Sequence, residues 1–151
     1  PLLMESSRSP SFLFTGSMAG FLTLSRVAGY GAAKRALHSW SDYCTVEFAK
    51  PIYPIIVRAN VIAPGFFPSD QNKPLLFSAI AQNMPLEELC LNPRSELLSD
   101  RGRQVIQHTP LGRFGLPKEL GGAAAFLISD SASFVNGATL EVDGGFSNFT
   151  I

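Results

Sequence analysis

The sequence predicts an α/β protein built on part of a doubly wound parallel sheet with flanking helices. Three observations lead to this class. Short apolar segments alternate with longer amphipathic ones, and each apolar segment ends at a glycine or proline turn. The 151 residues are 46% hydrophobic, which is enough for one core, and no shift in composition marks a second domain. We therefore expect residues 1–151 to form a single, incomplete domain.

The first half of the chain carries two predicted strands around one long helix. Residues 1–10 lack helical and strand periodicity and are expected to be irregular. Ser11–Thr15 is an apolar run that ends at a glycine, which predicts a strand buried on both faces. Residues 55–63 are rich in β-branched side chains and predict a second buried strand. Between them, residues 27–50 predict an amphipathic helix, because apolar residues recur there at helical spacing, namely Ala33, Leu37, Trp40, Cys44 and Phe48.

The second half begins with a long, mixed segment. Residues 66–107 are broken into short helical pieces by prolines, a pattern typical of a substrate lid or binding insertion. A helix is predicted from Pro117, which suits a first turn, to Ser129. Residues 138–142 predict a last strand, closed by a glycine pair. Because ligands bind outside the carboxyl ends of parallel strands, the residues after the three strands are the first candidates for a site.

One group of polar residues fits such a site. Tyr30 and Lys34 are four residues apart near the start of the long predicted helix, so their side chains share one face. Ser17 follows the first predicted strand, at the end where an open sheet presents ligands. Taken alone, the pair is equally well explained as an aromatic at a helix start beside a solvated lysine.

With Ser17 thirteen residues before Tyr30, the pattern resembles the short-chain dehydrogenase/reductase family, whose signature is a serine thirteen residues before Tyr-x-x-x-Lys. The resemblance runs from about Ser11 to the end of the chain. It implies a Rossmann-type fold and an NAD- or NADP-dependent interconversion of a ketone and a secondary alcohol. It continues through three further motifs: Arg58-x-Asn60-x-x-x-Pro64-Gly65, Pro110-Leu111-Gly112-Arg113-Phe114-Gly115 and Val142-Asp143-Gly144-Gly145.

The resemblance assigns catalysis to Ser17, Tyr30 and Lys34. A carbonyl that accepts a hydride develops negative charge on its oxygen, which a hydroxyl acid must neutralise. Tyr30 is the expected acid, the cation of Lys34 favours its ionised form, and Ser17 donates to the same oxygen. Tyr30 and Lys34 are also expected to hold the nicotinamide ribose. The carboxamide would face the cofactor-binding residues Pro64, Gly65, Phe67 and Ser69.

The substrate is less clearly indicated. Gly65-Phe66-Phe67, Arg101-Gly102 and His108-Thr109-Pro110 resemble the fructuronate reductase or mannonate oxidoreductase branch, close to gluconate 5-dehydrogenase-like proteins. A sugar acid requires several hydrogen-bond partners and a cation for its carboxylate. The lid segment supplies such groups, although a solvated lid surface explains them equally well: Gln71, Asn72, Lys73, Arg101 and Arg103.

Two other functions stay open. The same chemistry could act on another polyol or on a 3-oxoacyl thioester. Alternatively, the chain is an inactive truncated fragment, because a complete enzyme of this family should open with a strand, a Gly-rich turn and a helix that binds the pyrophosphate. No such turn precedes Ser11, so we expect the amino-terminal half to be missing and the fragment alone to be inactive. The choice between NAD and NADP is therefore also open.

Composition excludes several classes of partner. Twelve Lys and Arg balance twelve Asp and Glu, so no positive field draws in nucleic acid or a membrane surface. No apolar run is long enough to span a bilayer. Cys44, Cys90 and the two histidines lack metal-ligand spacing, so no metal site is expected. We expect a cytoplasmic protein that acts on a small molecule, and the resemblance implies a homo-oligomer paired through the long helix and the last strand.

Three further residues have individual interpretations. Asn60 is expected to bond the backbone between strands rather than to take part in catalysis. His38 continues the face of Tyr30 and Lys34, a position more typical of an interface or surface residue than of a proton relay. Gly16 stands where related sequences carry a second serine.

Overall fold

The protein is described by a computed structural model that covers residues 10–149. Three strands form a parallel sheet in the order β1-β2-β3, namely β1 (Ser11–Thr15), β2 (Arg58–Pro64) and β3 (Thr139–Val142). The predicted order of strand, helix, strand, broken helices, helix and strand is confirmed. The prediction for residues 1–10 falls almost entirely outside the described residues.

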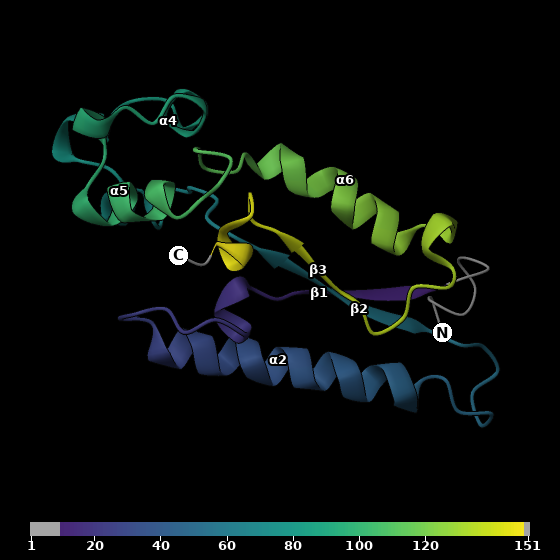
Figure 1. Cartoon of the computed structure of the whole chain (residues 1–151). Helices are drawn as coiled ribbons and strands as arrows, with labels where there is room; N and C mark the ends of the chain where they lie inside the picture. Colours follow the sequence, from purple (N-terminus) through teal and green to yellow (C-terminus); the bar gives the residue numbers. More distant parts are fainter. Residues whose placement is uncertain (1–9, 150–151) are drawn as a thin grey trace. The chain divides into compact units, whose positions relative to one another are not determined.

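Two helices accompany the sheet. In Figure 1, α2 (Ala28–Glu47) lies below the strands and α6 (Pro117–Ile128) above them, so the strands lie between two helices. The remaining helices are short, as the prolines of residues 66–107 predict. They are η1 (Met18–Gly20), α3 (Lys73–Leu76), η2 (Ala79–Ala81), α4 (Leu86–Leu91), η3 (Ser95–Leu97), α5 (Asp100–Gln107), η4 (Asp130–Ala132) and η5 (Phe146–Asn148). In the part of the chain that the structure describes, no helix is long and apolar enough to cross a membrane.

The described chain divides into two compact units. Residues 10–64 and 120–142 form the first, which contains the sheet and which we call the sheet unit. Residues 65–119 and 143–149 form the second, which we call the helical unit. The chain passes from one unit to the other after Pro64, Glu119 and Val142.

The strands of the sheet unit differ in burial. β2 is the central strand and is buried from Arg58 to Ala63, as predicted. β1 is only half-buried, so the prediction that it is buried on both faces is wrong. It is an edge of the described sheet, with one hydrogen-bonded neighbour. β2 also begins later than predicted, because residues 51–55 form turns and Val57 donates back to the carbonyl of Phe48.

The buried face of the long helix α2 agrees with the predicted one only in part: Cys44 is buried, and Leu37 and Phe48 are half-buried. Trp40 belongs to the predicted apolar face, yet it is 56% exposed and stacks on Tyr43 at the surface. The buried positions of α2 are Ser41 and Cys44. A serine is small enough to let the helix approach the sheet closely, and hydrophobicity alone does not reveal that.

Two polar side chains of the buried strand β2 hold the sheet unit together. The guanidinium of Arg58 donates to the carbonyls of Leu127 at 2.8 Å and Ser129 at 3.1 Å, and so caps the last turn of α6. Asn60, which is fully buried, donates to the Val135 carbonyl and accepts from the Ala138 amide, each at 2.9 Å. The predicted structural role of Asn60 is therefore confirmed.

The helical unit has its own apolar core. Phe77 and Phe114 meet edge to face with ring centroids 5.2 Å apart, and leucines from the short helices surround them. Arg113 binds both carboxylate oxygens of Glu119, at 2.8 and 2.6 Å, and the Leu116 amide donates to the same carboxylate. These contacts lower the pKa of Glu119 to about 2. The carboxylate therefore stays ionised while it caps the first turn of α6.

We expect Asn60→Ala to destabilise the chain by about 1–3 kcal/mol, because it removes both bonds of a fully buried side chain and takes the Asn60 acceptor from the part-buried Ala138 amide. Equilibrium unfolding in urea measures this loss. Asn83→Ala, at an exposed asparagine, is the control and should change stability by less than about 0.5 kcal/mol. Equal effects of the two substitutions would contradict the role assigned to Asn60.

Candidate active site

Ser17 lies on the turn that follows β1. The Gly16 amide extends the sheet by donating to the Ile62 carbonyl at 2.8 Å, and the chain then turns into η1. Ser17 caps η1, since its hydroxyl oxygen accepts from the Ala19 amide at 3.2 Å. The side chain is nearly buried, at 7% exposure. That bond uses the oxygen as an acceptor and leaves the hydroxyl hydrogen for another partner.

Tyr30 and Lys34 lie in the first two turns of α2. The Lys34 ammonium is 5.7 Å from the centroid of the Tyr30 ring, a distance at which a cation is attracted to the ring face. It donates to the Thr15 carbonyl at 2.7 Å, and so ties α2 to the carboxyl end of β1. The Tyr30 side chain is 50% exposed. The lysine is thus fixed at the strand end, and the phenol beside it is open to a ligand.

Two residues outside the predicted catalytic group, Gly31 and Arg35, fasten this turn to α2. Gly31 lets η1 approach the helix, because an added Cβ would lie 3.2 Å from the Ala19 carbonyl oxygen. Arg35 donates to the Gly20 carbonyl at 3.1 Å. Their spacing of four residues places them on one helix face. The sequence alone does not show that this face contacts η1.

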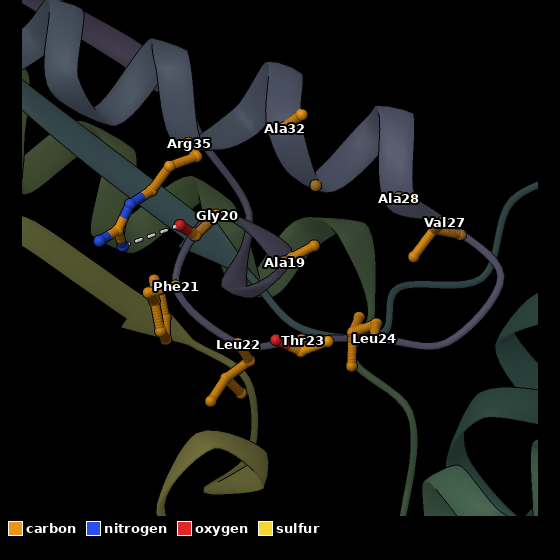
Figure 2. A pocket seen from close by; sticks show the side chains of 11 residues that line it. Ala19, Gly20, Phe21, Leu22, Thr23, Leu24, Val27, Ala28, Ala32 and Arg35 are labelled. Atoms are coloured by element: carbon orange, nitrogen blue, oxygen red, sulfur yellow. Dashed lines mark hydrogen bonds between the residues drawn. The ribbon is translucent and has the colours of Figure 1, made fainter.

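A pocket of about 340 Å³ lies beside these residues in the sheet unit. Figure 2 shows its lining, which comes from η1, the loop of residues 21–24 and the first turns of α2, with Arg35 bonded to Gly20. Its lining does not include Ser17, Tyr30 or Lys34. The pocket therefore borders the elements that carry the candidate catalytic residues and does not contain those residues.

The predicted cofactor residues are split between the units. Pro64 ends β2 in the sheet unit, while Gly65, Phe67 and Ser69 belong to the helical unit. At Gly65 a Cβ would lie 2.6 Å from the Asp143 backbone, so only glycine fits there. The ring of Phe67 packs on Gly115. Ser69 is exposed.

The predicted substrate residues all lie in the helical unit, in unequal settings. Gln71 is exposed, and Asn72 accepts from the Ser69 amide at 2.7 Å and donates to the Phe67 carbonyl at 3.0 Å. Lys73 is only 9% exposed and donates to the Met84 carbonyl at 2.7 Å. Arg101 is half-buried in the first turn of α5.

Arg103, the remaining cation of this group, is committed to its own unit. It donates to the carbonyls of Ser95 and Leu98 and forms an ion pair with Asp100. Within residues 10–149, no group of three His, Cys, Asp or Glu side chains is placed to hold a metal ion.

Comparison with known proteins identifies the family. A sequence profile described as short chain dehydrogenase matches residues 1–76. This match covers half of the 151 residues. The chain belongs to the short-chain dehydrogenase family. A second profile, described as Enoyl-(Acyl carrier protein) reductase, matches residues 95–147 of this short-chain dehydrogenase.

Similar proteins are oxidoreductases. An uncharacterized oxidoreductase of Haemophilus influenzae is 36% identical over 148 residues, which are 97% of this chain and 45% of that protein. The structure of a protein assigned as a D-mannonate oxidoreductase from Haemophilus influenza, with bound NAD, is 35% identical, has a TM-score of 0.76 and covers 93% of this chain and 44% of that one.

A gluconate 5-dehydrogenase from Burkholderia cenocepacia, solved with NADP and tartrate, is 27% identical to this chain. Its TM-score is 0.70, and the match covers 95% of this chain and 47% of that one. These neighbours confirm the predicted Rossmann-type α/β class for this short-chain dehydrogenase. The chain spans about half the length of the relatives it matches.

Proposed function

We propose that this chain carries the catalytic half of an oxidoreductase that interconverts a ketone and a secondary alcohol with NAD or NADP. The observation that supports it best is the position of the Lys34 ammonium, 5.7 Å from the Tyr30 ring and bonded to the Thr15 carbonyl at the end of β1. A phenol beside a fixed cation is suited to giving up and taking back a proton.

Each of the three side chains has one task in this proposal. Tyr30 gives its phenolic proton to the carbonyl oxygen of the substrate during reduction and takes it back during oxidation. Lys34 stabilises the phenolate that remains. Ser17 donates its hydroxyl hydrogen to the same carbonyl oxygen. This hydrogen is available because the bond from the Ala19 amide uses only the serine oxygen.

The residues at this site fit a nicotinamide ribose. An ammonium has three hydrogens, and Lys34 uses one of them on the Thr15 carbonyl, so it retains donors for ribose hydroxyls. The half-exposed phenol of Tyr30 offers a further partner. Gly65, Phe67 and Ser69 would face the carboxamide. When bound, the cofactor supplies or accepts the hydride.

We expect Tyr30→Phe to lower turnover by about 10²–10⁴-fold, because it removes the acid and keeps the ring. Oxidation of NADH or NADPH with fructuronate and related keto acids measures this, for the chain alone and for the chain joined to its upstream region. Tyr43→Phe is the matched control, since Tyr43 lies on the same helix with 53% exposure, and it should keep full turnover.

The outcomes separate the alternatives for this chain. Turnover that needs the upstream region and is lost in Tyr30→Phe supports a catalytic half that is inactive alone. Turnover by the chain alone contradicts the expected inactivity of the fragment. Full turnover in Tyr30→Phe contradicts the catalytic role. No turnover in any form supports an inactive fragment.

We propose a sugar acid of the fructuronate, mannonate or gluconate type as the substrate. Names of two structural neighbours point to this class. Asn72 and Lys73 bond the backbone of the helical unit, and Gln71 is exposed. Arg101 is the cation whose pairing with the substrate carboxylate we test. Another polyol or a 3-oxoacyl thioester is the alternative, and the profile named for acyl carrier protein substrates favours testing the thioester.

We expect Arg101→Gln to raise the Michaelis constant for a uronate by about 10-fold or more and to leave that for a neutral polyol unchanged, because only the uronate loses a charge-assisted partner. Steady-state kinetics of the active, extended chain measures both. Arg94→Gln, at an exposed arginine of the same unit, is the control. An equal rise for both substrates would argue against a carboxylate contact.

We further propose that the protein is a cytoplasmic homo-oligomer. A second copy would pack on α2, where Trp40, Tyr43 and Val46 are exposed. The buried cysteines Cys44 and Cys90 are free thiols, which a reducing compartment preserves. Cell fractionation tests the location, and recovery in a membrane or secreted fraction would contradict it.

We expect Trp40→Glu to shift the protein toward the monomer, because it places a charge in the proposed apolar contact. Light scattering coupled to gel filtration measures the mass. Ile80→Glu, at an exposed residue of the helical unit, is the control and should leave the mass unchanged. A wild-type monomer at all concentrations would rule out the oligomer.

A further inference from the structure

His38 occupies the space beneath the turn that carries Ser17. Gly16 and Gly20 stand at the two ends of this turn. A Cβ at Gly16 would lie 2.5 Å from the His38 Nε2 atom, and one at Gly20 would lie 2.9 Å from it. Real Cβ atoms do not approach other atoms so closely, so the imidazole fills the room that both glycines leave. The turn and the ring are therefore fitted to one another.

The Nε2 atom of His38 is buried and has no hydrogen-bond partner among the described residues. An unpaired buried nitrogen is normally costly, and a charged one is more costly still. The ring also lies 5.8 Å from that of Phe21, which closes one side of its site. This environment favours a neutral imidazole over an imidazolium.

The surrounding cations also favour the neutral form of His38. Burial is the main cause that holds the pKa of His38 below 6.5, and the nearby cations Arg35 and Lys34 add to it. Asp42 and the backbone of Ser17 oppose the shift without reversing it. The unfolded chain therefore binds this proton more readily, and the folded state loses stability as the pH falls below about 6.5.

We propose that His38 is a positioning residue for Ser17: its neutral imidazole, wedged between Gly16 and Gly20, fixes the turn that presents the serine hydroxyl. The inference rests on the proposed function in one respect, that the hydroxyl of Ser17 contacts the reacting oxygen. It also bears on Gly16, since a Cβ at this position would meet both the ring of His38 and the side chain of Val61 at 2.5 Å. Protonation of His38 releases the turn.

Nuclear magnetic resonance tests the placement without requiring turnover. The chain has two histidines, so His108 is an internal reference. During a titration from pH 8 to pH 5, the amides of Ser17, Ala19 and Gly20 should shift with the midpoint of the His38 ring. The shift should vanish in His38→Gln and persist in His108→Gln. The proposal is overturned if the chemical shifts of these amides do not change with pH, or if they change with the midpoint of His108.

A double-mutant cycle tests the fit of the ring to the turn. Gly20→Ala should lower the urea midpoint of unfolding in the wild-type background and do so much less in His38→Ala, where the ring is absent. Equal losses in both backgrounds would overturn the fit. Gly20 is preferred to Gly16 for this cycle, because a Cβ at Gly16 would also meet Val61.

Kinetics of the extended, active chain tests the effect on Ser17. His38→Gln should lower kcat by about 10²-fold, the cost of a reacting group misplaced by roughly 1 Å, and leave the Michaelis constant for the cofactor within about twofold. The fall of kcat in acid that accompanies His38 protonation should also disappear. An unchanged kcat would overturn the positioning role. If the wild-type chain never turns over, the proposed function fails, and the resonance titration still decides whether His38 fixes the turn.

Discussion

The sheet unit depends on the burial of β2, because every polar group in a buried strand must find its partner inside the protein. The backbone of β2 pairs with β1 on one side and β3 on the other. Its two polar side chains complete the arrangement, since Arg58 caps the end of α6 and Asn60 binds both sides of the turn before β3. One strand thus fixes a helix end and a neighbouring strand.

The candidate active site follows from this arrangement. β1 is held in register by β2, so the position of the Thr15 carbonyl is set by the sheet. Lys34 donates to this carbonyl, and Arg35 donates to Gly20 at the far end of the turn. The helix that carries Tyr30 is therefore joined to both ends of the turn that carries Ser17. Such bonding holds the Ser17 hydroxyl and the Lys34 ammonium in place, with the Tyr30 ring beside the ammonium, before a substrate arrives.

The sequence predicted the elements better than their burial. The bounds of β1 were correct because an apolar run met a glycine, and the positions of Ser17, Tyr30 and Lys34 after β1 and in α2 followed from the family pattern. The buried face of α2 was predicted only in part: Cys44 is buried, but Ser41 is polar and buried, and Trp40 is apolar and exposed. Lys73 was predicted either to contact the substrate or to be solvated on the lid surface, yet its ammonium donates to the Met84 carbonyl. Burial depends on the neighbouring elements, whose placement a local pattern does not contain.

Pairs of residues are harder still to predict, because neither member is informative alone. Gly16 is a small departure from the family pattern, and His38 is one polar residue on a long helix. The structure places the two side by side: a Cβ added to Gly16 would lie 2.5 Å from the His38 Nε2 atom. A Cβ at position 16 would meet His38 and Val61 equally closely, at 2.5 Å, so these two side chains together fill the space beside Gly16. Gly16 is therefore best interpreted together with His38 and Val61, because the shape of the turn depends on how closely these side chains pack against it.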